Sequence, residues 1–289
     1  MSKVSIIGAG NVGATAAFVI LMKRLADVVM VDIVDSVLGK ALDMQQAATI
    51  EKIDNKIIGT TDFSEIKNSD IVVVTAGKPR TPDIKTREDL LEVNKGIIDN
   101  VLTQVKQYCP NAILIIVTNP LDLLVNYIIG QGFDSRKVIG QSGTLDSARF
   151  KTFLGKGSEG MVIGYHSDDM IPVVSAAKIN GVSVSEVLSQ EEIDQIIERT
   201  RKGGKEIGNL LGTTAYYAPG AAIAQMVDAV LNDANEVIPC CVKVDGQYGI
   251  VNTCLGLPCK LGKEGAEIVE IELSEEEMNS LKASVNKRK

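Results

Sequence analysis

Apolar and polar positions in the first half of the chain alternate between two patterns. Short, continuous apolar runs occur at residues 4–8, 28–32, 57–59, 71–75, 112–118 and 137–140. Such runs are typical of parallel strands that are covered on both faces. Between them lie longer stretches with apolar residues at helical spacing, at 12–23, 37–49, 87–108 and from Pro120 onward. Because predicted strands and helices alternate along the chain, the pattern predicts βαβ units in a doubly wound parallel sheet.

The pattern changes after about residue 143, where the predicted elements no longer alternate regularly. We expect a strand at 173–178 before an Asn180-Gly181 turn, helices at 145–154 and 217–232, a helical stretch at 184–211, and antiparallel strands at 237–244 and 250–257. A last helix begins near Ser274, which can form a capping box with Glu277.

The order of these elements predicts an α/β protein with two tightly packed domains. We expect a Rossmann-type domain with a doubly wound parallel sheet at 1–142 and an α+β substrate-binding domain at 143–289. No repeat, low-complexity segment or Pro/Gly/Ser-rich linker separates them. A functional site is therefore expected in the crevice between the two domains.

Composition narrows the class of protein and of partner. Hydrophobic residues make up 45% and charged residues 23% of the 289 positions, as in a globular enzyme. A formal net charge of -7 gives no overall attraction to nucleic acid or to an anionic membrane. The first residues lack the basic segment and cleavage site of a signal peptide, and the apolar runs are too short to cross a bilayer. We therefore expect a cytoplasmic protein that has neither nucleic acid nor a membrane as partner.

Five cysteines are present, an odd number without the paired short spacing of a zinc site. We interpret them as reduced thiols and expect no metal. A metal site is the alternative that this spacing disfavours.

A glycine-rich segment follows the first predicted strand directly. It reads G-A-G-N-V-G and places Gly8, Gly10 and Gly13 at the turn into the first predicted helix. Glycines at this spacing permit a tight turn and let a pyrophosphate approach the helix N-terminus. The next strand ends in Asp32, where a carboxylate accepts hydrogen bonds from the adenosine ribose and repels a 2′-phosphate. The order predicts an NAD site; the alternative is a glycine-rich turn that binds no nucleotide.

Two further motifs carry groups for acid–base chemistry. His166, the only histidine, stands in G-Y-H-S-D just past an apolar strand. A hydride-transfer enzyme needs a proton donor that titrates near neutrality, although a lone histidine is often structural. Asp146 and Arg149 stand three residues apart in L-D-S-A-R-F and share one face of a predicted helix. An ordinary intrahelical salt bridge is the alternative for this pair.

Two loops complete the candidate chemistry. V-T-N-P at 117–120 follows a predicted strand at the carboxyl edge, where open parallel sheets bind ligands, although it can also be a simple turn. T-A-G-K-P-R-T-P at 75–82, followed by R-E-D-L from Arg87, is a charged, proline-rich segment between a buried strand and a long helix. Such a segment suits a mobile lid, and an inert surface loop is the alternative.

These motifs occur in a specific order along nearly the whole chain: G-A-G-N-V-G, V-D-I, T-A-G-K-P-R, R-E-D-L, V-T-N-P, L-D-S-A-R-F, G-Y-H-S-D and A-Y-Y-A-P-G. The series resembles the lactate/malate dehydrogenase family, and more closely its malate branch. The resemblance implies reversible hydride transfer between NAD(H) and L-malate or oxaloacetate. It also implies a small dicarboxylate or 2-oxo acid as substrate and a homodimer or homotetramer as the assembly.

The resemblance also implies a role for each motif residue. His166 would be the acid–base group and Asp146 its carboxylate partner, while Arg149 would bind the substrate C1 carboxylate and Arg87 would polarise the carbonyl. Arg80 on the lid would bind the second carboxylate of oxaloacetate, where lactate enzymes resemble one another in carrying glutamine. Asn119 would orient substrate and histidine. The implied cofactor contacts are Gly8, Gly10, Asn11, Val12, Gly13, Asp32, Thr75, Ala76, Gly77, Asn94, Val117 and Asn119.

The chain departs from the family pattern at three places. The lid carries about one extra residue and has Asp83 where glycine is common, and the segment from Asp146 to His166 is several residues shorter. Tyr165 and Ser167 flank the histidine where small residues are usual. The lid change leaves an L-lactate or other 2-hydroxy acid dehydrogenase open as an alternative, and a non-catalytic NAD-binding module is a third interpretation.

Overall fold

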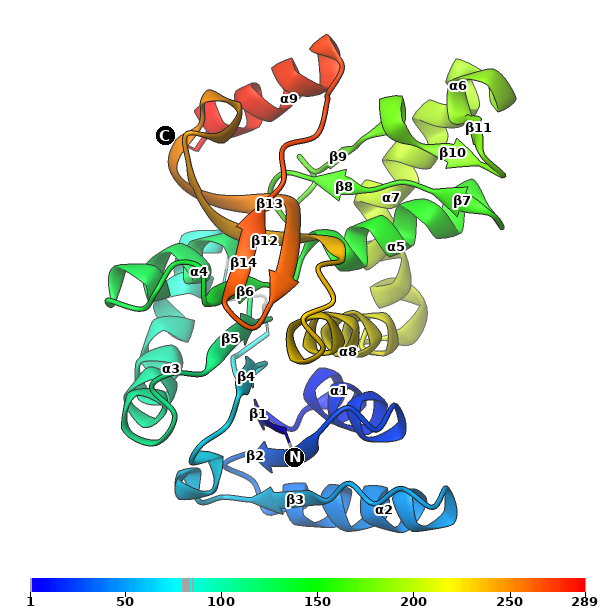
Figure 1. Cartoon of the computed structure of the whole chain (residues 1–289). Helices are drawn as coiled ribbons and strands as arrows, with labels where there is room; N and C mark the ends of the chain where they lie inside the picture. Colours follow the sequence, from blue (N-terminus) through cyan, green and yellow to red (C-terminus); the bar gives the residue numbers. More distant parts are fainter. Residues whose placement is uncertain (1, 80–83, 85, 289) are drawn as a thin grey trace.

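The computed structural model describes residues 2–79, 84 and 86–288, and a single sheet runs through its centre (Figure 1). The first half of the chain contributes six strands to this sheet, and they lie in the order β6-β5-β4-β1-β2-β3. All five neighbouring pairs among them are parallel. The elements of this half are β1 (Lys3–Ile7), α1 (Asn11–Met22), β2 (Asp27–Val31), α2 (Ser36–Ile50), β3 (Ile57–Thr60), η1 (Phe63–Ile66), β4 (Ile71–Val74), α3 (Arg87–Tyr108), β5 (Ile113–Ile116), α4 (Leu121–Gly130) and β6 (Val138–Gly140). This is the doubly wound sheet that the sequence predicts.

Helices cover both faces of the sheet, so each central strand is buried on two sides (Figure 1). One core layer joins the sheet to α1 through residues such as Ile20, and to the later helix α8 (Tyr217–Leu231) through Ile223. The opposite layer joins it to α3 through Val101 and to α4 through Leu124. Every residue of β4 and β5 is buried, which explains their continuous apolar sequences.

The second half of the chain extends the same sheet. The strands β12 (Val237–Asp245), β13 (Val251–Gly262) and β14 (Gly265–Ile268) form an antiparallel meander, and β12 pairs with β6 at Cys241 and Gly140. The resulting nine-stranded order is β14-β13-β12-β6-β5-β4-β1-β2-β3. The pairing covers the open side of the apolar strand β6, which would otherwise expose unpaired backbone groups. The two regions are therefore continuous through one sheet, and a domain division at 142/143 remains a prediction.

The other elements of the second half are α5 (Gly143–Leu154), β7 (Ser158–Glu159), β8 (Val162–Ile163), β9 (Ile171–Pro172), η2 (Val174–Ala176), β10 (Lys178–Ile179), β11 (Val182–Ser183), α6 (Val184–Val187), α7 (Gln190–Leu211), η3 (Gln247–Gly249) and α9 (Glu275–Asn286). The antiparallel β10–β11 pair confirms the predicted hairpin turn at Asn180-Gly181, and Ser274 caps α9 together with Glu277 as predicted.

One predicted element of this half was wrong. Half of the expected strand at 173–178 is the short helix η2, and only its last residue enters β10. The expected helical stretch at 184–211 is confirmed as two helices, because the Ser189 side chain forms a capping box with Glu192 and begins α7. Among the residues that the structure describes, no helix combines the length and apolar composition needed to span a membrane.

Candidate active site

The glycine-rich turn between β1 and α1 lies against the loop after β4. Gly8 has a φ of 100°, and a Cβ placed there would lie 2.5 Å from the backbone nitrogen of Ala76. A Cβ at Gly13 would lie 1.9 Å from the carbonyl oxygen of Gly8. At Gly10, by contrast, a Cβ would meet no described atom within 4 Å. Two glycines therefore pack the turn, while the third leaves open space at the start of α1.

That open space belongs to a cleft at the carboxyl edge of the parallel strands. The cleft encloses about 740 Å³ and brings together the glycine turn, the loops after β4 and β5, α5, and the loop at 164–170 that carries His166, called the histidine loop below. Of the sequence-predicted site residues, it is lined by Gly10, Asn11, Val12, Gly13, Thr75, Gly77, Val117, Asn119, Arg149 and His166. The cleft therefore lies where open parallel sheets bind ligands.

The turn and β2 have the donor and acceptor groups that a dinucleotide requires. The start of α1 presents free backbone N–H groups and the positive end of its dipole to the open space at Gly10, which suits a pyrophosphate. Asp32 follows β2, and its carboxylate accepts the N–H of Ala9 at 2.6 Å and of Ile33 at 2.7 Å. A carboxylate has about four acceptor sites, so this one retains capacity for a ribose hydroxyl. These residues fit the predicted NAD.

The catalytic candidates His166 and Asp146 are 20 residues apart in the sequence and are in contact in the structure. His166 Nδ1 lies 2.7 Å from Asp146 Oδ2, and the other oxygen of Asp146 accepts Arg149 Nη1 at 2.9 Å. Asp146 is 2% exposed, so both bonds are shielded from water. Each carboxylate oxygen of Asp146 thus has one partner, and Asp146 joins the histidine to the arginine. The intrahelical ion pair that was the alternative for Asp146 and Arg149 is therefore present, but it is buried and it also includes His166.

The environment of His166 favours its protonated form. Burial by itself lowers the pKa of this imidazole, but the charge of Asp146, its hydrogen bond and the charge of Asp122 raise it, against a lowering effect of Arg149. The net result is a pKa above the ordinary value of histidine. His166 can therefore hold a proton near neutral pH and release it into the cleft.

A second buried carboxylate lies behind the histidine, and sequence reasoning missed it. Asp122, in the first turn of α4, accepts the backbone N–H of His166 at 3.2 Å and Arg87 Nη2 at 3.4 Å. Burial raises the pKa of Asp122, while the charges of His166 and Arg87 lower it. The one signal in the sequence is a single aspartate in the otherwise apolar first turn of a helix, which is also typical of a residue that only stabilises the helix dipole.

Arg87 and Asn94 lie beside the cleft and do not line it. Arg87 begins α3, and its side chain is 33% exposed and paired with Asp122. Asn94 is fully buried, and its amide accepts the N–H of Lys78 at 2.8 Å and donates to the carbonyl of Asn119 at 2.7 Å. The structure thus gives Asn94 the task of holding two loops of the cleft together. Its predicted contact with the cofactor remains a prediction.

Two more features of the cleft escaped the sequence analysis. Gly203 and Gly204 lie inside α7, and a Cβ at either would lie 3.1 to 3.3 Å from the side chain of Arg149. Adjacent glycines within a predicted helix are the signal that could have shown this close approach. Gln141 lines the cleft and is buried, and its Nε2 has no hydrogen-bond partner among the described atoms, nor has Nε of Arg149. Two residues that line the cleft therefore each carry a buried donor that has no protein partner among the described atoms.

Arg80, the residue predicted to decide the substrate, lies outside the described residues. The same holds for Asp83 and most of the extra length of the predicted lid. The described end of the lid is well defined, because Thr86 caps α3 in a capping box with Asp89.

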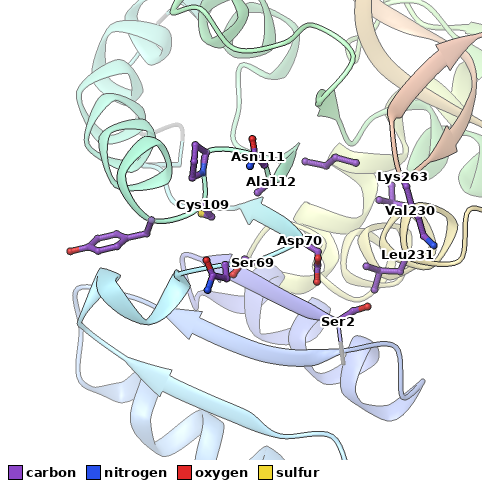
Figure 2. Close-up of a pocket in the computed structure, with 13 residues that line it drawn as sticks. Ser2, Ser69, Asp70, Cys109, Asn111, Ala112, Val230, Leu231 and Lys263 are labelled. Atoms are coloured by element: carbon purple, nitrogen blue, oxygen red, sulfur yellow. The ribbon is translucent and has the colours of Figure 1, made fainter.

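A second cavity, of about 410 Å³, opens at the opposite edge of the sheet (Figure 2). Ser2, Asp70 and Ala112, which precede β1, β4 and β5, line it together with Cys109 and Lys263. It contains none of the predicted site residues. In the part of the chain that the structure describes, no group of three or more His, Cys, Asp or Glu side chains is arranged to hold a metal ion. We therefore assign the chemistry to the cleft at the carboxyl edge.

Comparisons with known proteins agree with this geometry over the whole chain. The family model for the lactate/malate dehydrogenase NAD binding domain matches residues 2–140, and that for the alpha/beta C-terminal domain matches residues 143–289. The malate dehydrogenase of Chloroherpeton thalassium is 45% identical over 99% of this chain and 96% of its own length. Among solved structures, the malate dehydrogenase of Cryptosporidium parvum has a TM-score of 0.94 at 40% identity, covering 99% of this chain and 96% of that one. The lactate dehydrogenase of the same organism, complexed with lactic acid and nicotinamide adenine dinucleotide, has a TM-score of 0.94 at 38% identity, covering 99% and 95%.

These matches confirm the predicted fold class, the predicted NAD cofactor and the resemblance on which both rested. The two family models agree with the structure, which has a parallel sheet suited to NAD and a histidine–aspartate–arginine cluster at the carboxyl edge of that sheet. The chain belongs to the lactate/malate dehydrogenase family.

Proposed function

We propose that this protein is an NAD-dependent malate dehydrogenase that interconverts L-malate and oxaloacetate. The observation that carries the proposal is the 2.7 Å contact of His166 with the buried Asp146 beside a cleft that also holds Arg149 and the glycine turn. The relatives named malate dehydrogenase, at 41–47% identity, support the choice of substrate.

His166 acts as the acid in the direction of oxaloacetate reduction. NADH supplies a hydride to the ketone carbon, and the developing alkoxide requires a proton. Nδ1 of His166 is bound to Asp146, so the other ring nitrogen is the one that serves the substrate. The carboxylate fixes the ring and stabilises the imidazolium before reaction. In malate oxidation the neutral ring removes the hydroxyl proton.

Arg149 binds the C1 carboxylate of the substrate. Arg149 lines the cleft, and Asp146 holds one of its terminal nitrogens, Nη1, at 2.9 Å. A guanidinium offers two parallel hydrogen bonds to a carboxylate, which fixes the orientation of the ketone as well as its position. Arg87, which is paired with Asp122 in the structure, polarises the carbonyl once it turns toward the substrate.

The test is consumption of NADH with a panel of 2-oxo acids. We expect turnover of oxaloacetate well above that of pyruvate, and loss of that turnover in His166→Asn. Preference for pyruvate would instead identify a lactate dehydrogenase of the same fold. If the protein binds NADH and consumes it with none of these acids, it is a non-catalytic NAD-binding module and the proposal fails.

Arg80 is proposed to bind the second carboxylate and so to select oxaloacetate over pyruvate. Replacement by glutamine, Arg80→Gln, removes a charge that pairs with this carboxylate and should cost about 2–5 kcal/mol of transition-state binding. The ratio of kcat/KM for oxaloacetate to that for pyruvate measures this change. An unchanged ratio would exclude Arg80 as the selecting residue.

We also propose that the protein assembles as a homodimer or homotetramer through the side of the sheet that carries α1, α2 and α8 (Figure 1). Leu38 and Leu42 on α2 are 51% and 61% exposed, and Tyr217 at the start of α8 is 67% exposed. Exposed apolar groups on neighbouring helices are typical of a subunit interface. Light scattering tests the assembly, and Leu38→Glu with Leu42→Glu should shift it toward the monomer.

A cytoplasmic location is proposed from the state of the cysteines. All five are free, and all are buried. Free buried thiols are typical of proteins in a reducing compartment. Fractionation of cells that make the protein is the direct test.

A further inference from the structure

Arg288, just after α9, contacts the histidine loop. Its Nη2 donates to the hydroxyl of Ser167 at 2.8 Å and lies 3.2 Å from Asp169 Oδ2. Its guanidinium carbon lies 3.9 Å from the centre of the Tyr165 ring. The side chain of Arg288 thus contacts Tyr165 and Ser167, on either side of His166, and also Asp169.

The start of the histidine loop is held by the strand β13. Gly164 exchanges two backbone hydrogen bonds of 2.8 Å with Gly256 in β13, and the Tyr165 hydroxyl bonds the hydroxyl of Thr253 at 2.7 Å. Tyr165 is 5% exposed, so its ring is buried between this strand and Arg288. Past the histidine, side chains of three described residues hold the loop. Arg288 and Lys287 contact Asp169, with Lys287 Nζ 3.2 Å from Asp169 Oδ1, and Nε of Arg201 in α7 donates to the carbonyl of Met170 at 3.1 Å.

The helix that carries Arg288 is anchored without it. Leu281 and Val285 of α9 are buried in the same apolar cluster as Tyr165, at 0% and 4% exposure. Glu277 of the same helix accepts the N–H of Ser175 at 3.0 Å and its hydroxyl at 2.6 Å. Loss of the Arg288 side chain therefore leaves α9 in place and removes the contacts with Tyr165 and Ser167, next to the histidine, while Lys287 and Arg201 still hold the far end of the loop.

The charges that face the imidazole belong to other elements. Asp146 and Arg149 face it from α5, and Asp122 from α4. Arg288 contacts the loop at Ser167 and Asp169, so any effect on the imidazole is transmitted by the position of the loop. Tyr165 and Ser167, the two side chains larger than expected beside the histidine, are both contacts of Arg288.

We propose that Arg288 is a positioning residue for proton transfer, which holds the histidine loop so that His166 stays on Asp146 and faces the substrate. The inference rests on the proposed dehydrogenase activity for its kinetic consequence only. A shift of about 1 Å in a catalytic group can cost about a hundredfold in rate, so partial release of the loop in Arg288→Ala should lower kcat about tenfold. KM for NADH should change less than about twofold, because the glycine turn lies on another element.

The first test needs no substrate, because His166 is the only histidine in the chain. Its ring signals in a protein labelled at histidine can be titrated by NMR without assignment. In Arg288→Ala we expect the pKa of His166 to fall toward its ordinary value, since a loosened loop weakens the contact with Asp146. Arg288→Lys keeps the ion pair but loses the planar contact with the ring and should give an intermediate pKa and kcat.

Lys282→Ala is the matched control. It removes one positive charge from α9, and Lys282 is exposed and makes no hydrogen bond or ion pair with the described residues. We expect its titration and kcat to equal those of the unaltered protein. A second variant, Ser167→Ala, removes the acceptor without altering α9, and its effect on kcat should be smaller in the Arg288→Ala background than in the unaltered protein.

An unchanged His166 titration and an unchanged kcat in Arg288→Ala would overturn the proposal. So would equal effects of Arg288→Ala and Lys282→Ala, because a loss of charge alone would then explain both. If Arg288→Ala fails to fold, Arg288→Lys and Ser167→Ala carry the test, and normal titration and kcat in both would overturn it. If no 2-oxo acid is turned over but the titration shifts as expected, the proposed function fails and the positioning of His166 by Arg288 stands.

Discussion

Replacement of Asp146 by asparagine is the sharpest test of the site, because this carboxylate joins His166 to Arg149. Its two oxygens lie 2.7 Å from Nδ1 of the histidine and 2.9 Å from Nη1 of the arginine, and it is 2% exposed. Asparagine keeps the size of the side chain and removes the charge. The variant should therefore fold while the imidazolium and the guanidinium lose their shared counter-charge.

The magnitude follows from the burial of the pair. Removal of one partner from a buried ion pair typically costs about 3–5 kcal/mol. If most of this loss falls on the transition state, in which the imidazolium is the proton donor, kcat for oxaloacetate reduction should fall by about 10²–10⁴-fold, at about 1.4 kcal/mol for each factor of ten.

The raised pKa of His166 also determines in which direction the pH profile shifts in Asp146→Asn. Reduction needs protonated His166, so kcat/KM for oxaloacetate is constant at low pH and falls as pH rises through the pKa of the free enzyme. Burial lowers that pKa, and the charge and hydrogen bond of Asp146 raise it above the ordinary value. In Asp146→Asn the fall should therefore begin at lower pH, while malate oxidation, which needs the neutral ring, should extend to lower pH.

Steady-state NADH absorbance over a range of pH measures both effects, and thermal unfolding provides the control for folding. A variant that unfolds near the normal temperature but keeps its kcat and its pH profile would refute the reasoning. Ser147→Ala is not a suitable comparison, because the hydroxyl of Ser147 accepts the N–H of Val162 at 2.8 Å. Thr152→Ala, on the exposed part of the same helix, is the matched control and should behave like the unaltered protein.

Three further predictions test other parts of the cleft. Gly10→Ala should fold normally, since a Cβ there meets no described atom, but it should weaken NADH binding about tenfold, or about 1.4 kcal/mol. Gly13→Ala should instead lower the melting temperature, because its Cβ would lie 1.9 Å from a backbone oxygen. Gly204→Ala should gain about 0.8–1 kcal/mol of helix stability and raise KM for oxaloacetate, because the new methyl group crowds Arg149; an unchanged KM would contradict this role. Asp122→Asn should move the pH profile in the same direction as Asp146→Asn but by less, which the same assay measures.

Local sequence determined much of the architecture. Continuous apolar runs such as 71–75 and 112–118 predicted buried parallel strands, which the structure has as β4 and β5, since a strand covered on both faces has no polar side. The glycine turn and Asp32 predicted the nucleotide site because their chemistry depends on a few neighbouring positions. The strand at 173–178 was predicted incorrectly, and the break between α6 and α7 within the helical stretch at 184–211 was not predicted, because η2 and the cap at Ser189 are set by local hydrogen bonds that apolar spacing does not show.

Long-range contacts were decided by the tertiary structure. Asp146 and Arg149 are neighbours on one helix by their spacing, but only the packing of the histidine loop against α5 brings His166 within 2.7 Å of that carboxylate. Asp122 and Arg288 had no visible role in the sequence, since they act on a histidine 44 and 122 positions away. The pairing of β12 with β6, which unites both halves in one sheet, has the same origin. Spacing along a chain fixes which side chains share a face, whereas the partner of that face depends on how distant segments pack.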